Sequence, residues 1–300
     1  MHRTILRGTI ALVAGAGLLT AGVGPALAGG HDDTEAETVE VVGDGDSVDV
    51  STESVDAGLI SFEVSSTNPS TADGGGSEIT LFRLKEDRTL DDFFGHLANE
   101  FSTDPAVVAQ ATQDLKDDAV YRGLAVVVPN YPETVTEFLR PGTYYLMDLG
   151  GQPPNNRPTL TTLEVEGDGH RHGHHGDLDS DVDVTALDDR FHAPDTWPAE
   201  GTYTFSNEDD TLHFMLIVPV KPGTTDDEVQ AAFDDPNLTG PPAFAMEGPS
   251  GGNDVVSPGY RLQVSYDLPA GTYVLLCFVG DEETGMPHAV MGMHKVVVLE

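Results

Sequence analysis

The sequence predicts an all-β protein made of two tandem Greek-key β-sandwiches, each with a short helical excursion. Three observations lead to this prediction. Short runs of β-branched and aromatic residues alternate with clusters of Gly, Pro, Asn and Asp along the 300 residues. The same succession of runs occurs twice. Within each copy, one segment starts with two aspartates and has the character of a helix, whose positive N-terminal end favours acidic side chains.

An internal repeat supports the division into two copies. Asp-Asp at 91–92 recurs at 226–227, and Gly-Thr-Tyr at 142–144 recurs at 271–273 in the same order. The first copy is expected to have strands at 58–66, 78–84, 140–149 and 159–166 and helices at 91–101 and 105–118. The second is expected to have strands at 201–207, 213–220, 268–278 and 292–300 and a helix at 226–233.

Composition divides the rest of the chain. We expect an acidic lead-in at 29–48, a first domain at 49–166, a linker rich in His, Asp and Gly at 167–183, and a second domain at 184–300. The 14 basic and 51 acidic residues give a net charge of −37, which repels nucleic acids and anionic membranes. Such an acidic coat either maintains solubility in high salt or attracts cations, and composition does not distinguish the two.

Residues 1–28 are predicted to be a signal peptide. Arg3 and Arg7 precede an apolar run over 8–24, and Ala-Leu-Ala at 26–28 forms a small-residue cleavage site. The run is too short for a convincing membrane span, and no later stretch is long and apolar enough to cross a bilayer. We therefore expect an exported protein, secreted or held in the cell envelope or periplasm, with no stable membrane insertion.

The single cysteine, Cys277, is informative in an exported chain, where cysteines normally pair as disulfides. The open alternatives are an intermolecular bridge, an inert buried thiol and a metal ligand. His213 opens an earlier strand, and His288 and Met293 follow the cysteine after a turn-rich loop. A type 1 copper site typically uses two imidazoles, one thiolate and a weak thioether. Along the chain, these ligands come in the order His, Cys, His, Met.

These motifs resemble the cupredoxin family of blue copper proteins. AGTYVLLC, which ends at Cys277, resembles the plastocyanin strand that carries the copper cysteine, and GMPHAVMGM resembles the His-to-Met turn of the copper nitrite reductases. The resemblance implies one mononuclear copper ion with His213, Cys277 and His288 as equatorial ligands and Met293 as the axial one. Met286 and Met291 lie close in sequence, so the choice of axial ligand stays open.

The chain also departs from the family pattern. Three acidic residues at 281–283 lie in a long loop, and Phe214 stands where the family often has an Asn that braces this loop, so a looser site is expected. In the first copy, Glu78, Asp148 and Thr159 are the expected counterparts of the ligands, which limits the chain to one site. The competing interpretation is a copper-free sandwich in which Cys277 and the methionines fill the core.

The leading function is one-electron transfer with an unidentified redox or copper-transfer partner, and not enzymatic catalysis. Copper oxidases and nitrite reductases place a His directly before the copper cysteine, where this chain has Leu276. Extracellular copper capture or delivery is the alternative, with auxiliary histidines as weaker sites. These are His31, which cleavage would place third in a Gly-Gly-His terminus, and the linker histidines His170, His172, His174 and His175. A copper-free binding module is the third possibility.

Overall fold

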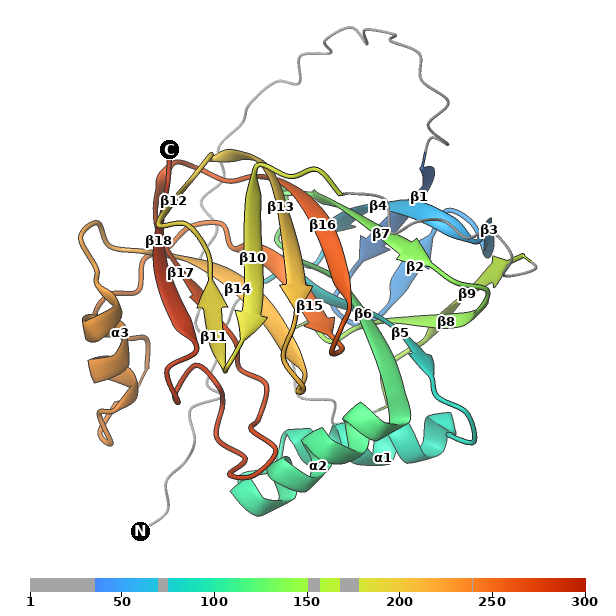
Figure 1. Ribbon diagram of the computed structural model, residues 1–300, viewed down its shortest axis with the longest axis horizontal. Helices are drawn as coiled ribbons and strands as arrows, with labels where there is room; N and C mark the ends of the chain where they lie inside the picture. Colours follow the sequence, from blue (N-terminus) through green and yellow to red (C-terminus); the bar gives the residue numbers. More distant parts are fainter. Residues whose placement is uncertain (1–35, 70–74, 151–156, 168–177, 239) are drawn as a thin grey trace, which may run out of the picture.

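Two large β-sheets form the body of the protein in the computed structural model, which describes residues 36–69, 75–150, 157–167, 178–238 and 240–300 (Figure 1). The first copy contains β1 (Glu37–Gly43), β2 (Val48–Val50), β3 (Ser54–Asp56), β4 (Gly58–Ser66), β5 (Ser77–Leu84), α1 (Leu90–Glu100), α2 (Pro105–Asp118), β6 (Ala119–Val127), β7 (Glu133–Leu139), β8 (Gly142–Asp148) and β9 (Thr161–Glu166). The predicted all-β sandwich fold is confirmed. Among the described residues, no helix is both long and apolar enough to cross a membrane.

The second copy repeats this plan without a counterpart of α2. It contains β10 (Val182–Leu187), β11 (Arg190–His192), β12 (Thr196–Trp197), β13 (Glu200–Asn207), β14 (His213–Val220), α3 (Asp226–Phe233), β15 (Gly251–Val256), β16 (Arg261–Asp267), β17 (Gly271–Leu276) and β18 (His294–Leu299). In each copy the first strand is parallel to the fourth and forms an antiparallel hairpin with the second.

Both sheets run without interruption through the two copies. One has the order β11-β10-β13-β16-β7-β4-β1-β2, and the other has the order β12-β18-β17-β14-β15-β6-β5-β8-β9-β3. Each order is symmetric about its centre, where β16 pairs with β7 and β15 pairs with β6, as expected for two copies related by a pseudo-two-fold axis. One buried apolar cluster contains side chains of both copies, so the copies share a core.

The expected domain boundaries need correction. β1 lies inside the predicted acidic lead-in, and β10 begins at Val182 inside the predicted linker. In β1, Val39 and Val41 point into the core while Glu37 and Glu40 face solvent. The two-residue alternation of a half-buried strand is therefore present, and the abundance of acidic residues obscured it.

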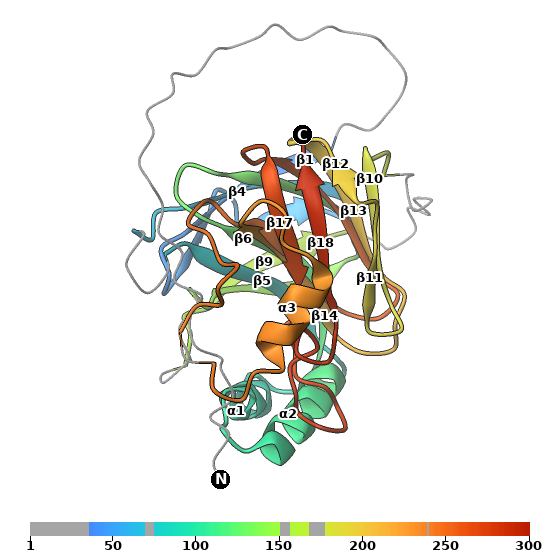
Figure 2. The same cartoon turned by 90° about the vertical axis from the view of Figure 1, so that its left-hand side faces the viewer.

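Helices α1 and α2 pack together at one end of the sandwich, beside the long loop that follows β17 (Figures 1 and 2). The side chain of Asp104 caps α2 by accepting from the main-chain N–H of Ala106, and Pro105 occupies the first turn, where its missing N–H costs nothing. Val108, Ala111 and Leu115 recur at helical spacing on the buried face. The predicted span of this helix, 105–118, is confirmed.

The seam between the copies contains buried carboxyl groups. Glu133 at the start of β7 accepts from the main-chain N–H of Gly252 in the second copy, with 3.1 Å between N and Oε1. Its other oxygen has no partner among the described residues, and burial raises the pKa of this carboxyl well above 4.5. Nearby, Glu137 pairs with Arg122, and burial raises the pKa of Glu137 to about 7 despite the guanidinium.

We predict that Glu133→Gln stabilises the protein at high pH. The unfolded chain ionises this carboxyl near 4.5 while the folded chain keeps its proton, so Glu133 makes stability fall as the pH rises above that value. Chemical denaturation should give the variant a gain at pH 8, relative to pH 4.5, of about 1–3 kcal/mol. Glu63→Gln, at an exposed residue of the neighbouring strand β4, should show no such difference. A gain that is equal at both pH values would contradict the prediction.

Candidate metal centre

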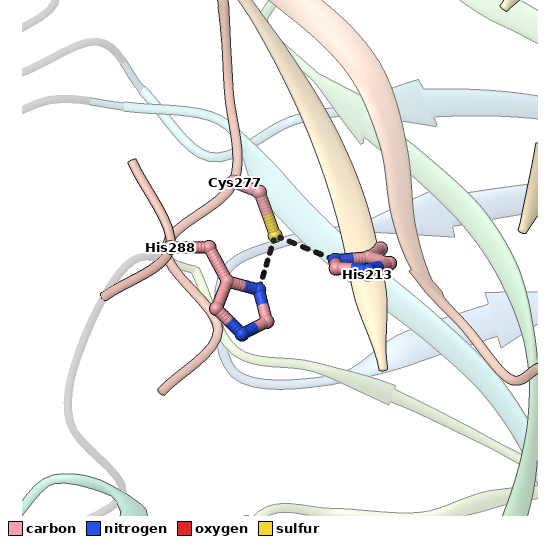
Figure 3. A group of neighbouring side chains, drawn as sticks. All are labelled: His213, Cys277 and His288. Atoms are coloured by element: carbon pink, nitrogen blue, oxygen red, sulfur yellow. Dashed lines mark hydrogen bonds between the residues drawn. The ribbon is translucent and has the colours of Figure 1, made fainter. Parts of the chain in front are cut away.

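Three side chains from distant parts of the second copy converge in the core (Figure 3). The sulfur of Cys277 lies 3.7 Å from Nδ1 of His213 and 3.6 Å from Nδ1 of His288. The two imidazole rings are 4.9 Å apart between centroids and are inclined by 57°. His213 and Cys277 are fully buried, and His288 is 1% exposed. The three residues that the sequence predicts as equatorial ligands therefore lie together, away from water.

The strand pairing determines where these side chains lie. β14 and β17 are antiparallel neighbours, with Leu216 opposite Leu276, so His213 at the start of one lies close to Cys277 just beyond the end of the other. The main-chain N–H groups of Phe214 and Val279 act against burial and lower the pKa of the Cys277 thiol. Two such donors stabilise a thiolate better than a thiol.

The loop after Cys277 is held by its own main chain. His288 donates its N–H to the carbonyl of Val279 at 3.0 Å, and Ala289 donates to the carbonyl of Cys277 at 2.6 Å. Met293 closes the loop by donating to the carbonyl of His288 at 2.8 Å. These bonds fix the His288 backbone beside the cysteine, although ten residues separate the two in sequence.

The three candidate axial methionines have different environments. Met293 is fully buried in the same apolar cluster as Cys277. Met286 is half-buried, and Met291 is 39% exposed with its sulfur accepting from the hydroxyl of Thr284. Burial thus favours Met293 over the other two, and its role as a ligand stays a prediction.

Burial keeps the donors of the centre in uncharged forms. It lowers the pKa of His213 to about 4, an effect that His288 reinforces and Asp209 opposes. It also lowers the pKa of His288, against the attraction of Asp189 and Asp281. For Cys277, burial raises the pKa to about 12 in the absence of metal. The imidazoles are therefore neutral and ready to ligate at neutral pH, whereas the thiol must lose a proton when a metal binds.

Two aspartates face the far sides of the histidines. Asp209 Oδ2 lies 3.4 Å from Nε2 of His213, and Asp189 Oδ1 lies 3.9 Å from Nε2 of His288. Neither Nε2 atom has a hydrogen-bond partner among the described residues. The sequence analysis missed both aspartates because Asp-rich turns are common on an acidic surface, and nothing in their spacing links them to the ligands.

The donor set fits a copper ion. A metal bonded at about 2.0 Å to nitrogen and about 2.3 Å to sulfur in a trigonal plane separates these donors by roughly 3.7 Å. The two N–S separations of 3.7 and 3.6 Å match this requirement. Both Nδ1 atoms face the sulfur, so the lone pairs of two neutral imidazoles and one thiolate can meet at one point. Soft sulfur combined with imidazole favours copper over hard cations such as Mg²⁺ or Ca²⁺.

The corresponding position in the first copy contains a hydrogen-bonded carboxylate. Asp148 is the last residue of the equivalent strand β8, at the position predicted for the counterpart of Cys277, and it accepts from the main-chain N–H groups of Gly45, Glu78 and Gly150. The expected pairing of Glu78 with His213 is one residue out of register, because the strand pairing of β5 with β8 places Ser77 there. The β8–β9 pairing likewise aligns Thr159 with Met293, not with His288 as predicted.

Helix α2 of the first copy braces the candidate metal-binding loop of the second, residues 278–287 between Cys277 and His288. The ammonium group of Lys116 lies 2.7 Å from Oε2 of Glu282, and Oε1 of Glu282 accepts from the hydroxyl of Thr211 at 2.7 Å. The loop approaches the helix closely at Gly280 and Gly285, where an added Cβ would overlap Val108 and Pro105, respectively. The sequence predicted a looser loop because Phe214 replaces a bracing Asn, whereas the structure braces the loop from the other copy.

Comparison with known proteins gives matches to solved structures only; no family model and no curated protein matches the chain. An auracyanin of Roseiflexus castenholzii is 23% identical over 39% of this chain and 94% of its own, with a TM-score of 0.24. Auracyanin A, a blue copper protein of Chloroflexus aurantiacus, is 14% identical over 40% of this chain and 97% of its own, with a TM-score of 0.23. Reduced rusticyanin is 20% identical over 40% and 77%, with a TM-score of 0.24.

At such TM-scores these similarities carry no argument about the fold or the function of this chain. The auxiliary histidines His31, His170, His172, His174 and His175 lie outside the described residues, as does the predicted signal peptide.

We predict that Gly285→Ala loosens the metal-binding loop. Gly285 has φ +66° and lies against the carbonyl of Pro105, so an added methyl group strains the backbone and pushes the loop away from α2. The free energy of unfolding should fall by about 2–4 kcal/mol. Gly223→Ala is the matched control, because Gly223 has φ +83° but open space around it, and should cost only about 1–2 kcal/mol. If thermal and urea unfolding gave equal losses of stability for Gly285→Ala and Gly223→Ala, the contact with α2 would be unimportant.

Proposed function

We propose that this protein is an exported copper protein that carries single electrons. One copper ion would be held by His213, Cys277 and His288, with Met293 as the weak axial ligand. The observation that carries the proposal is the convergence of two neutral imidazole nitrogens on one buried sulfur, 3.6 and 3.7 Å away. The absence of an intrachain disulfide partner for Cys277 supports it, because an exported chain then needs another use for the thiol.

The protein residues would supply a rigid and dry environment. Copper in such a site supplies the one-electron chemistry by alternating between Cu⁺ and Cu²⁺. His213 and Cys277 lie on the ends of paired strands, so neither can move far when the charge on the metal changes. Burial excludes water from all three donors. The N–H groups of Phe214 and Val279 stabilise the thiolate and so tune the potential.

The site does not suggest an enzyme. The residue before Cys277 is Leu276, a fully buried side chain that offers no ligand to a second metal centre in the manner of a copper oxidase. Electron transfer to a protein partner of unknown identity therefore remains the preferred proposal, and delivery of copper remains the alternative.

The first test is titration of the mature protein with Cu²⁺ while the visible spectrum is recorded. We expect an intense thiolate-to-copper band that saturates near one equivalent and is absent from Cys277→Ser. Measurement of the bound copper should show the loss of that equivalent in the variant. A weak band that survives Cys277→Ser would place copper on the histidines of residues 31 and 170–175, overturning this proposal in favour of copper capture.

The second test separates the methionines. Met293→Leu removes the buried thioether, which stabilises Cu²⁺ more than a hydrocarbon does, so the reduction potential should rise by roughly tens of millivolts or more. Met291→Leu changes an exposed side chain of the same type only two residues away and should leave the potential nearly unchanged. A shift in the Met291 variant alone would assign the axial position to Met291.

A further inference from the structure

The far side of His213 contains a second group of metal-binding side chains. Asp189, Asp209 and His213 each offer one atom within 4.8 Å of the others. The atom of His213 concerned is Nε2, because Nδ1 faces the sulfur of Cys277. This nitrogen is completely buried and has no hydrogen-bond partner among the described residues, so an unpaired polar atom points at two carboxylates.

Two turns bring the carboxylates together. Asp188 and Asp189, both with φ +52°, form the two-residue turn between β10 and β11, which is the geometry of a type I′ hairpin. Asp209 lies in the connection that leads to β14, four residues before His213. The main-chain N–H of Asp189 donates to Oδ2 of Asp209 at 2.9 Å, so one turn is tied to the other. The group is therefore preorganised by the fold.

Hydrogen bonds to the imidazoles do not explain why Asp189 and Asp209 lie beside the histidine Nε2 atoms. The separations of 3.4 Å to Asp209 and 3.9 Å to Asp189 exceed the roughly 2.7–3.2 Å of a normal N–H···O bond. The two carboxylates also repel each other, and Asp281 adds a third negative charge nearby. Arg190 helps to offset this charge, but its Nη1 donates to the carbonyl oxygen of Asp189 and not to either carboxylate. A divalent cation would relieve the repulsion and pair the nitrogen at once.

We propose that Asp189, Asp209 and Nε2 of His213 form a second cation site, which shares His213 with the copper centre. Two carboxylates and one imidazole favour Zn²⁺, with water completing the coordination. Asp189 is the access point, since 42% of its side chain is exposed against 15% for Asp209. On binding, Nε2 would give up its proton to solvent, so that one imidazolate contacts both metals.

The two sites would then be coupled through one ring. When a cation replaces the proton on Nε2, the electron density at Nδ1 changes, and with it the strength of the bond from Nδ1 to the first metal. The copper spectrum would therefore report zinc binding at a site that has no visible absorption of its own. This inference does not depend on electron transfer being the role of the copper, because it concerns only the residues on the outer side of His213.

The test is calorimetric titration of the full copper-loaded chain with Zn²⁺, with the visible spectrum recorded in parallel. Asp189→Asn and Asp209→Asn each remove one ligand charge, and Asn at 189 tolerates the left-handed backbone. Asp188→Asn is the matched control, because it removes the same charge from an exposed neighbour in the same turn. Zinc bound by the histidines of residues 31 and 170–175 is common to all these chains and cancels in the comparison.

We expect the wild type and Asp188→Asn to bind one zinc equivalent more than Asp189→Asn and Asp209→Asn, and zinc to shift the copper band only in the first two. Equal zinc stoichiometry in all four chains would overturn the inference, as would an extra equivalent that leaves the copper band unchanged. If no thiolate–copper band forms at all, the proposed function fails, while the zinc stoichiometries of Asp188→Asn and Asp189→Asn still decide this inference.

Discussion

The side chain of Glu282 connects the three segments on which the metal centre depends. Its carboxylate pairs with Lys116 of α2 and accepts from Thr211, and its main-chain carbonyl accepts from Gln113, also of α2. Thr211 lies two residues before His213, and Glu282 lies between Cys277 and His288. The pair with Lys116 is only partly exposed, so water weakens it less than a typical surface ion pair. One carboxylate thus fixes the loop that carries His288 relative to the strand that carries His213.

This connection gives the ligand-free first copy a structural role. The two copies share both sheets, and that continuity places α2 of the first copy against the metal-binding loop of the second. An isolated second copy would lack Lys116 and Gln113, the partners of Glu282 on α2, and the surface against which Gly280 and Gly285 pack. The first copy itself has no need of metal, because Asp148 is satisfied by three main-chain N–H groups where Cys277 has two imidazole neighbours.

Sequence patterns predicted the inner part of the site better than its surroundings. The three residues His213, Cys277 and His288 were identifiable because the chain has a single cysteine and the order of that cysteine and the flanking histidines matches a known ligand set. Asp189 and Asp209 were not, because carboxylates are abundant here and their proximity arises only when two turns meet. For the fold, the eight apolar runs expected to be strands correspond to β4, β5, β8, β9, β13, β14, β17 and β18, whereas β1, β6, β7, β10, β15, β16 and the short strands β2, β3, β11 and β12 were not predicted. In β1, glutamates alternate with buried valines, which hid the strand. The repeat was found, but its register was one residue out around β5. The paired aspartates at 91–92 and 226–227 both lie in the first turn of their helices, but they are shifted by one position relative to the N-cap residues Thr89 and Thr225, which are the equivalent residues.

The charge of the chain has a local meaning at the metal centre. Composition left two explanations for the excess of acidic residues, solubility in high salt and attraction of cations. At the candidate centre, the side chains of His213, Cys277 and His288 are uncharged and buried, while Asp189, Asp209 and Asp281 place negative charge around them. A buried cation gains from this negative charge because low-dielectric surroundings strengthen its attraction to nearby carboxylates. The carboxylates would also stabilise Cu²⁺ relative to Cu⁺, since the more highly charged ion gains more from the same negative charges. At this end of the molecule, the position of the acidic residues therefore favours the second explanation, attraction of cations, over solubility in high salt.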